Sequence, residues 1–196
     1  MTITGMTAEE HKARTARSYK LLLLVSMVSM IMIFAGLTSA FVVSKSRADW
    51  LKDFQLPTPF FWSTAVIILS SLTFHLAKKA IQKDNRSATT TYLLITLGLG
   101  LLFVFLQFQG FNAIIARGFY PTGPSSSVTT TFLFVLAVVH LAHLFGGLLS
   151  LFVIIYKHFK QKYNSSQTLG IELGAMFWHF LDLLWIYLFL FLYFFK

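Results

Sequence analysis

The chain has 196 residues, of which 56% are hydrophobic and only 12% are charged, and it carries a formal net charge of +9. A soluble domain of this length cannot bury so large an apolar fraction, so we expect an integral membrane protein. The sequence contains no Cys, which excludes disulfide bonds, thiolate catalysis, Fe–S clusters and zinc–thiolate sites.

Five apolar runs are long enough to be transmembrane helices, because a helix needs roughly 20 apolar residues to cross a bilayer. In chain order they cover residues 21–43, 60–77, 92–108, 128–156 and 173–195. None of them alternates between polar and apolar residues, as the strands of a membrane β-barrel do. We therefore expect an all-α, polytopic membrane protein. Its five transmembrane helices should form one bundle over residues 21–196, after an N-terminal segment of residues 1–20.

The basic residues of the loops are distributed unequally between the two sides of the membrane. Eleven Lys and Arg residues lie before the first run, after the second and after the fourth, whereas five lie in the other loops and at the C-terminus. Short cytoplasmic loops carry the excess of Lys and Arg in membrane proteins. The pattern predicts a cytoplasmic N-terminus and an external C-terminus. It also accounts for the positive charge without nucleic acid as a partner.

The fourth and fifth runs contain ionisable side chains at depths where lipid would surround them. Such residues need partners inside the bundle, and they often mark functional sites. Glu172, His179 and Asp182 share one side of the fifth helix. His140 and His143 share one side of the fourth helix. Counted from the cytoplasmic ends, His143 lies about as deep as His179 and Asp182, so we expect these three to meet. Glu172 lies at the N-terminal end of its helix, where a carboxylate acts as a cap.

From the residues alone, three interpretations of this set stay open. The first is a buried polar network that locks the fourth helix to the fifth. The second is a b-type haem ligated by His143 and His179, which would make the chain a membrane electron carrier. The third is a di-iron, proton-relay or transport site at Asp182, although di-iron chemistry requires more carboxylates than the runs contain. We find no nucleophile–base pair or phosphate loop in the sequence, and we predict no catalytic residue.

The stretch Phe177–Trp185, FWHFLDLLW, closely resembles the signature of the C-terminal helix in subunit III of the haem-copper terminal oxidases. Five further stretches resemble segments of that family in the same order: residues 33–37 (IFAGL), 60–71 (FFWSTAVIILSS), 83–86 (KDNR), 92–107 (YLLITLGLGLLFVFLQ) and 140–147 (HLAHLFGG). The resemblance covers about residues 21–196. The five-helix length is similar to that of short bacterial forms, which lack the two leading helices of a seven-helix version.

The resemblance implies an accessory subunit of a respiratory terminal oxidase, with cytochrome c as the electron donor on family prevalence and quinol as the alternative. In this family the haem and copper belong to partner subunits, and subunit III holds no metal. It packs on subunit I, in a complex with subunit II that reduces oxygen to water with proton pumping, and it supports stability and proton uptake. The resemblance further implies a bacterial cytoplasmic (inner) membrane location. It leaves open both membership of a respiratory supercomplex and the presence of bound phospholipid, because the two leading helices that this chain lacks form one wall of the family's lipid cleft.

The resemblance also implies roles for individual residues. Structural roles in a polar network, or contacts with lipid, are expected for His140, His143, Glu172, Trp178, His179 and Asp182. One family residue is missing: a buried glutamate often lies five residues before the Ala that corresponds to Ala35, and Met30 occupies this place. A role of that carboxylate in proton delivery therefore does not carry over.

Overall fold

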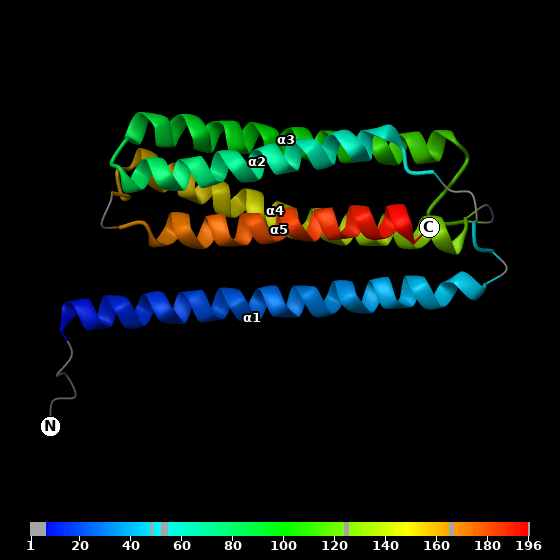
Figure 1. Ribbon diagram of the computed structural model, residues 1–196, viewed down its shortest axis with the longest axis horizontal. Helices are drawn as coiled ribbons and strands as arrows, with labels where there is room; N and C mark the ends of the chain where they lie inside the picture. Colours follow the sequence, from blue (N-terminus) through cyan, green and yellow to red (C-terminus); the bar gives the residue numbers. More distant parts are fainter. Residues whose placement is uncertain (1–6, 48, 52–54, 124–125, 165–166, 196) are drawn as a thin grey trace, which may run out of the picture.

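The computed structural model describes residues 7–47, 49–51, 55–123, 126–164 and 167–195. Five α-helices follow one another along the described chain: α1 (Ala8–Val43), α2 (Thr58–Gln82), α3 (Arg86–Ala116), α4 (Val128–Phe159) and α5 (Leu169–Phe194) (Figure 1). A short 3-10 helix, η1 (Ser44–Ser46), follows α1. All five are long and apolar enough to cross a membrane, and the described residues contain no β-strand. The expected all-α architecture with five transmembrane helices is confirmed.

Most of the helices extend beyond the apolar runs that predicted them, as far as their capping residues. α1 begins at Ala8, so residues 8–20 continue the first helix. Thr7 starts it through a capping box: the Glu10 amide donates to Thr7 Oγ1 at 3.3 Å, and the Thr7 amide donates to Glu10 Oε2 at 2.8 Å. A hydropathy pattern finds only the part of a helix that lies in lipid.

A tight turn joins α2 to α3 and makes them an antiparallel pair. Between Gln82 and Arg86, Asp84 has φ +53°, a left-handed conformation that Asp tolerates better than most residues. Asn85 then caps α3, because its Oδ1 accepts a hydrogen bond from the Ala88 amide at 3.1 Å. The three-residue connection leaves the two helices in contact along their length.

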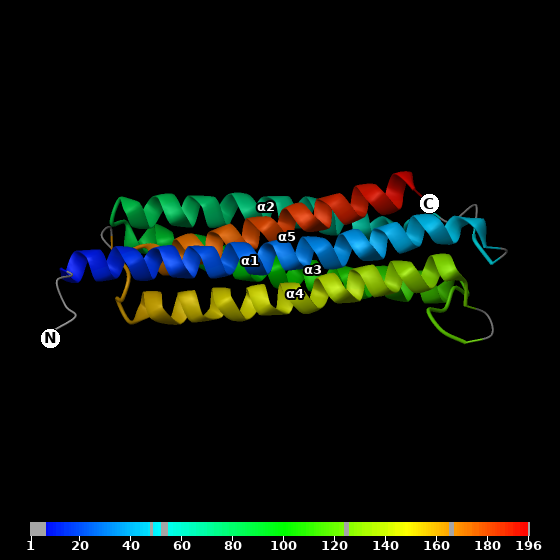
Figure 2. The same ribbon diagram turned by 90° about the horizontal axis from the view of Figure 1, so that it is seen from below.

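The helices α2 to α5 pack together, and α1 lies against the outside of this group. Figure 1 shows α1 apart from the other four, and its contacts are with α4 and α5. In the view of Figure 2, α5 runs between α2 and α1. Few α1 side chains are buried, among them Phe34, Thr38 and Phe41. The fifth helix is thus the central one, and Trp178 and Trp185 are its largest buried side chains.

Glycines allow close packing around α5. A Cβ atom on Gly100 of α3 would lie 2.9 Å from an atom of the Trp178 ring, and one on Gly147 of α4 would lie 2.7 Å from Leu181 Cδ1. Both distances are shorter than van der Waals contact, so the indole and leucine side chains occupy the space that a larger residue needs. Small residues at helix contacts serve this purpose in membranes, where van der Waals packing drives helix association.

We expect Gly100→Val to destabilise the chain, because the added side chain would overlap the Trp178 indole. Overpacking of this kind costs about 1–3 kcal/mol. The matched control is Gly98→Val, two residues away on the same helix, since no atom lies within 4 Å of a Cβ built there. Thermal unfolding in detergent, followed by tryptophan fluorescence, should show a lower midpoint for Gly100→Val than for Gly98→Val. Equal midpoints would contradict this packing.

Candidate functional site

His140 is a buried ring packed among aromatic side chains. It has no solvent exposure. Its ring centroid lies 5.2 Å from that of Trp185 on α5, 6.1 Å from Phe103 on α3 and 6.5 Å from Phe34 on α1. Neither ring nitrogen has a hydrogen-bond partner within the part of the chain that the structure describes. His140 therefore joins three helices through packing.

His143 lies one turn further along α4 and faces α1. Its Nδ1 is 2.8 Å from the carbonyl oxygen of Val139 on the same helix. Its ring centroid is 5.7 Å from that of Phe34. The His143 side chain therefore contacts its own helix through Nδ1 and packs its ring toward α1. It lies on the α1 side of the bundle.

His179 and Asp182 face α2. Ser71 Oγ lies 2.7 Å from His179 Nδ1, and the His75 ring centroid is 6.3 Å from that of His179. These four residues line a cleft of about 390 Å³ between α2 and α5. The polar neighbours of His179 and Asp182 therefore lie on α2.

The predicted meeting of His143 with His179 and Asp182 is wrong, although α4 and α5 are neighbours. Equal depth fixes the height of a side chain but not the direction in which it leaves the helix. Trp185 lies six residues after His179, and the helical repeat turns it to a different side of α5. That side meets His140. The His143 ring faces α1 and the His179 ring faces α2. The two rings therefore do not point at one common site, as the two axial ligands of a haem must.

Hydroxyl groups on α2 hold the two tryptophans of α5. Trp178 Nε1 donates to Ser70 Oγ at 3.1 Å, and Trp185 Nε1 donates to Thr64 Oγ1 at 3.1 Å. With the Ser71–His179 contact, this makes three side-chain links between α2 and α5. The polar network predicted between α4 and α5 thus lies between α2 and α5.

Sequence reasoning missed these hydroxyls. Thr64 and Ser71 are seven residues apart, as are Ser63 and Ser70, so both pairs recur at nearly two helical turns on one side of α2. This spacing was a signal that could have been used. Ser63 serves a different neighbour, since it accepts a hydrogen bond from Gln107 Nε2 of α3 at 2.9 Å.

Glu172 lies in the first turn of α5, as predicted from the sequence. The Thr168 hydroxyl donates to Glu172 Oε1 at 2.7 Å, and Lys20 Nζ of α1 lies 3.5 Å from Oε2. The two side chains of this ion pair are 44% and 27% exposed, so it contributes little energy. Its effect is to connect the N-terminal part of α1 with the start of α5.

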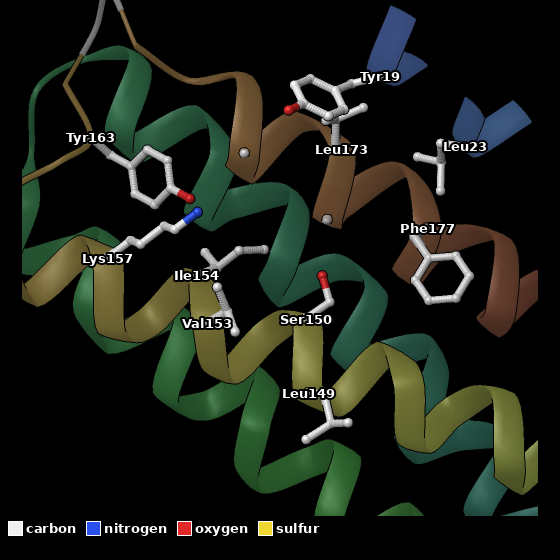
Figure 3. A pocket seen from close by; sticks show the side chains of 12 residues that line it. Tyr19, Leu23, Leu149, Ser150, Val153, Ile154, Lys157, Tyr163, Leu173 and Phe177 are labelled. Atoms are coloured by element: carbon white, nitrogen blue, oxygen red, sulfur yellow. The ribbon is translucent and has the colours of Figure 1, made fainter. Parts of the chain in front are cut away.

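Beside this ion pair, an elongated cleft of about 410 Å³ opens between α1, α4 and α5 (Figure 3). Its inner part is apolar and includes Leu149, Leu173 and Phe177. Its other end carries Lys157 and Tyr163, and burial raises the pKa of the Tyr163 phenol. An adjoining cleft of about 650 Å³ adds Lys162 and Gln167 among others. The shape is that of a site for an amphipathic molecule with an anionic or hydrogen-bonding end.

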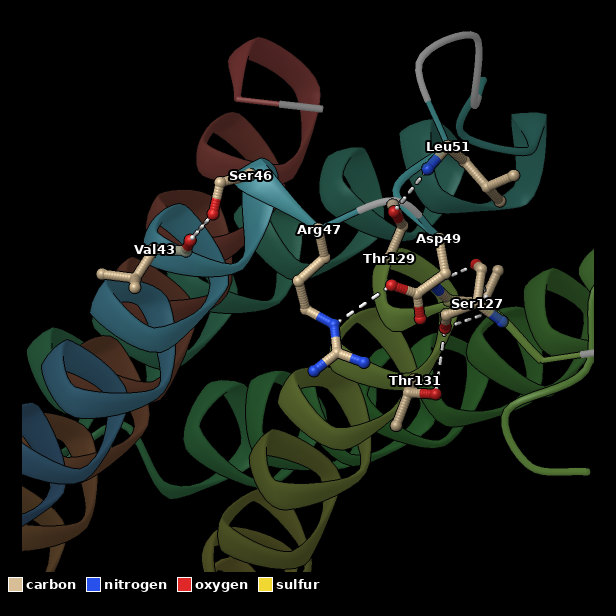
Figure 4. Close-up of polar contacts among 9 residues, drawn as sticks. Val43, Ser46, Arg47, Asp49, Leu51, Ser127, Thr129 and Thr131 are labelled. Carbon is tan, nitrogen blue, oxygen red and sulfur yellow. Dashed lines mark hydrogen bonds and ion pairs between the residues drawn. The ribbon is translucent and has the colours of Figure 1, made fainter.

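Polar contacts at the opposite end of the bundle fasten the loop after α1 (Figure 4). The Leu51 amide donates to Thr129 Oγ1 of α4 at 3.0 Å. Arg47 Nε lies 3.0 Å from Asp49 Oδ1 and lowers the pKa of that carboxyl. Both ion-pair partners are exposed, so the contact orders the loop without adding much stability. Among the described residues, no group of three or more His, Cys, Asp or Glu could hold a metal ion.

Comparison with known proteins identifies relatives along the whole chain. The family model "Cytochrome c oxidase subunit III" matches residues 1–196. The chain is 30% identical over 184 residues to the cytochrome bo(3) ubiquinol oxidase subunit 3 of Buchnera aphidicola (subsp. Schizaphis graminum), covering 91% of this chain and 95% of that one. It is 25% identical over 198 residues to the probable cytochrome c oxidase subunit 3 of Nocardia farcinica, covering 97% and 95%.

An insect relative is similar over a shorter part. The chain is 30% identical over 141 residues to the cytochrome c oxidase subunit 3 of Spodoptera frugiperda, covering 71% of this chain and 89% of that one. The full-length family match and the relatives confirm the resemblance that the sequence motifs indicated. The chain belongs to the subunit III family of the haem-copper terminal oxidases.

Proposed function

We propose that the chain is an accessory subunit of a bacterial respiratory oxidase, packs on subunit I in the cytoplasmic membrane and carries no redox centre. Membership of the family supports this proposal. The contacts that the histidines of the chain make in the structure support it as well. Aromatic rings enclose His140, a carbonyl of its own helix engages His143, and a hydroxyl engages His179. These contacts suit rigid packing, which would support the stability and proton uptake of the complex. Oxygen reduction would occur in the partner subunits.

The proposal is tested by purifying the affinity-tagged chain in mild detergent from membranes that contain its partners. We expect haem absorbance to accompany a larger polytopic subunit, identified by mass spectrometry. The absorbance should be lost when harsher detergent isolates the chain. Oxidation of cytochrome c or of a quinol by the eluate decides the electron donor. Haem that remains with the 22.3 kDa chain alone would overturn the proposal.

We propose a cytoplasmic N-terminus on the basis of the loop charges. The chain has no Cys, so single cysteines can be labelled without a background. Gln82, the last residue of α2, and Thr122, in the loop between α3 and α4, are exposed and lie at opposite ends of the bundle. A membrane-impermeant maleimide should label Thr122→Cys in spheroplasts and Gln82→Cys only after the membranes are inverted. The reverse pattern would show the opposite orientation.

We propose further that the cleft between α1, α4 and α5 holds a phospholipid. Lys157 and Tyr163 would face its phosphate, while Leu149 and Phe177 would contact its acyl chains. Acyl chains match the apolar lining, and a cation near the membrane surface attracts an anionic headgroup. The cleft requires α1, because Tyr19 and Leu23 form one of its walls.

Replacement of Lys157 by Ala should reduce the phospholipid retained by the purified complex. One Lys near the membrane surface contributes about 1 kcal/mol to the attraction of anionic lipid, which is about fivefold in occupancy. Lys160→Ala is the matched control, because Lys160 Nζ instead lies 4.8 Å from the centre of the Tyr156 ring. Quantitative lipid mass spectrometry after a detergent wash gives the ratio. Equal loss in both variants would contradict the site.

A further inference from the structure

Asp182 of α5 is a buried carboxyl group that makes no hydrogen bond. It is 2% exposed, and neither carboxyl oxygen has a hydrogen-bond partner among the residues that the structure describes. It is 13 residues after the first residue of α5 and 12 before the last, which places it about 20 Å and 18 Å from the two ends of the helix. An ionised carboxylate without donors is very costly in hydrocarbon, and such a group takes up a proton instead.

Ser71 of α2 connects this carboxyl group to a histidine. The carboxyl oxygens are inaccessible from outside the chain, so a proton reaches them through a neighbouring side chain. The Ser71 hydroxyl lies beside the carboxyl group without forming a hydrogen bond to it, and its Oγ is 2.7 Å from His179 Nδ1. A hydroxyl can accept one hydrogen bond while it donates another. Ser71 can therefore accept from a protonated Asp182 and donate to His179.

From Ser71 the titratable groups continue toward one end of the bundle. At this end α2 finishes and α5 begins (Figure 1). His179 is 10 residues after the first residue of α5 and His75 is seven before the last residue of α2, or about 15 Å and 11 Å from this end. Their ring centroids are 6.3 Å apart, and His75 is exposed at the rim of the cleft of about 390 Å³. In the other direction the cleft lining continues with Ile68 and Ile186, which cannot transfer a proton.

Few charged groups surround the carboxyl group. α2 contributes His75 and Lys78, and Lys78 is near enough to His179 for their charges to interact. On the α4 side, the His140 ring contacts Trp185. The α1 residues that line the adjoining cleft are apolar. No Lys or Arg of the described chain forms an ion pair with Asp182 that would hold it ionised.

We propose that Asp182 is a proton-binding site, which exchanges its proton through Ser71 and His179 with the end of the bundle where α5 begins. In the resting state the Asp182 hydroxyl donates to Ser71 Oγ, and the Ser71 hydroxyl donates to His179 Nδ1, so His179 keeps its own proton on Nε2. When one proton moves along each of these two hydrogen bonds, Asp182 becomes a carboxylate and His179 an imidazolium. His179 then releases its Nε2 proton toward His75, and a proton taken up along the same path restores the acid.

Infrared difference spectroscopy of the full chain in lipid bilayers at neutral pH tests the site. Asp182 is the one buried carboxyl group among the described residues. The spectrum of the wild type minus that of Asp182→Asn should therefore show the C=O stretch of a neutral carboxylic acid. Glu172→Gln is the matched control and should leave this band unchanged, because Glu172 is partly exposed and paired with Lys20. A difference spectrum without the band of a neutral acid would overturn the inference.

Hydrogen exchange tests the route. The rate at which the band shifts after transfer to heavy water is the rate at which the acid proton leaves. Ser71→Ala and His179→Phe should each keep the band but slow this exchange at least about tenfold, because a positioned proton-transfer group typically speeds transfer by about 100-fold or more. His143→Phe is the matched control and should exchange as fast as the wild type, since the His143 ring faces α1. Exchange at the wild-type rate in Ser71→Ala would show that the proton does not pass through this hydroxyl.

The inference goes beyond the proposed function and is decided separately from it. Both experiments use the full chain without its partners, so their results do not depend on whether the chain assembles with an oxidase.

Discussion

The contact between α2 and α5 is the constraint on which the rest of the structure depends. Polar groups in hydrocarbon must find partners within the protein, and α5 carries two tryptophans, a histidine and an aspartate. Three of these four side chains are hydrogen-bonded to α2, through Thr64, Ser70 and Ser71. These bonds fix how α5 is rotated about its axis, and this rotation decides what α5 presents to every other helix.

Two consequences follow from that rotation. The surface of α5 that faces α4 carries Trp185, which meets His140 in an aromatic contact. The surface between α1 and α2 carries Leu183, which is 66% exposed, whereas Asp182 on the α2 side is buried. A residue set that looked like one network in the sequence is therefore divided between the α4 side and the α2 side of α5.

Much of the fold could be predicted from the sequence, because lipid demands long apolar runs and helices satisfy their own backbone. The five helices and the location of Glu172 in the first turn of α5 followed from such patterns. Which side chains meet across the helix contacts could not be predicted. Depth along a helix can be counted, but which neighbour a side chain meets depends on packing. Gly146 illustrates this: a Cβ there would have no atom within 4 Å, whereas a Cβ on Gly147, one residue later, would lie 2.7 Å from Leu181 Cδ1 of α5.

The central claim is that hydrogen bonds from α2 hold Trp178, His179 and Trp185 of α5. A double-mutant cycle on Ser71 and His179 tests it most directly. Ser71→Ala, His179→Phe and the double variant would be compared by reversible unfolding of the chain in bicelles. The account predicts a coupling energy of about 0.5–2 kcal/mol, the range found for hydrogen bonds between membrane helices. A coupling of zero for this pair, with a clear coupling between His143 and His179 in the same assay, would contradict the account.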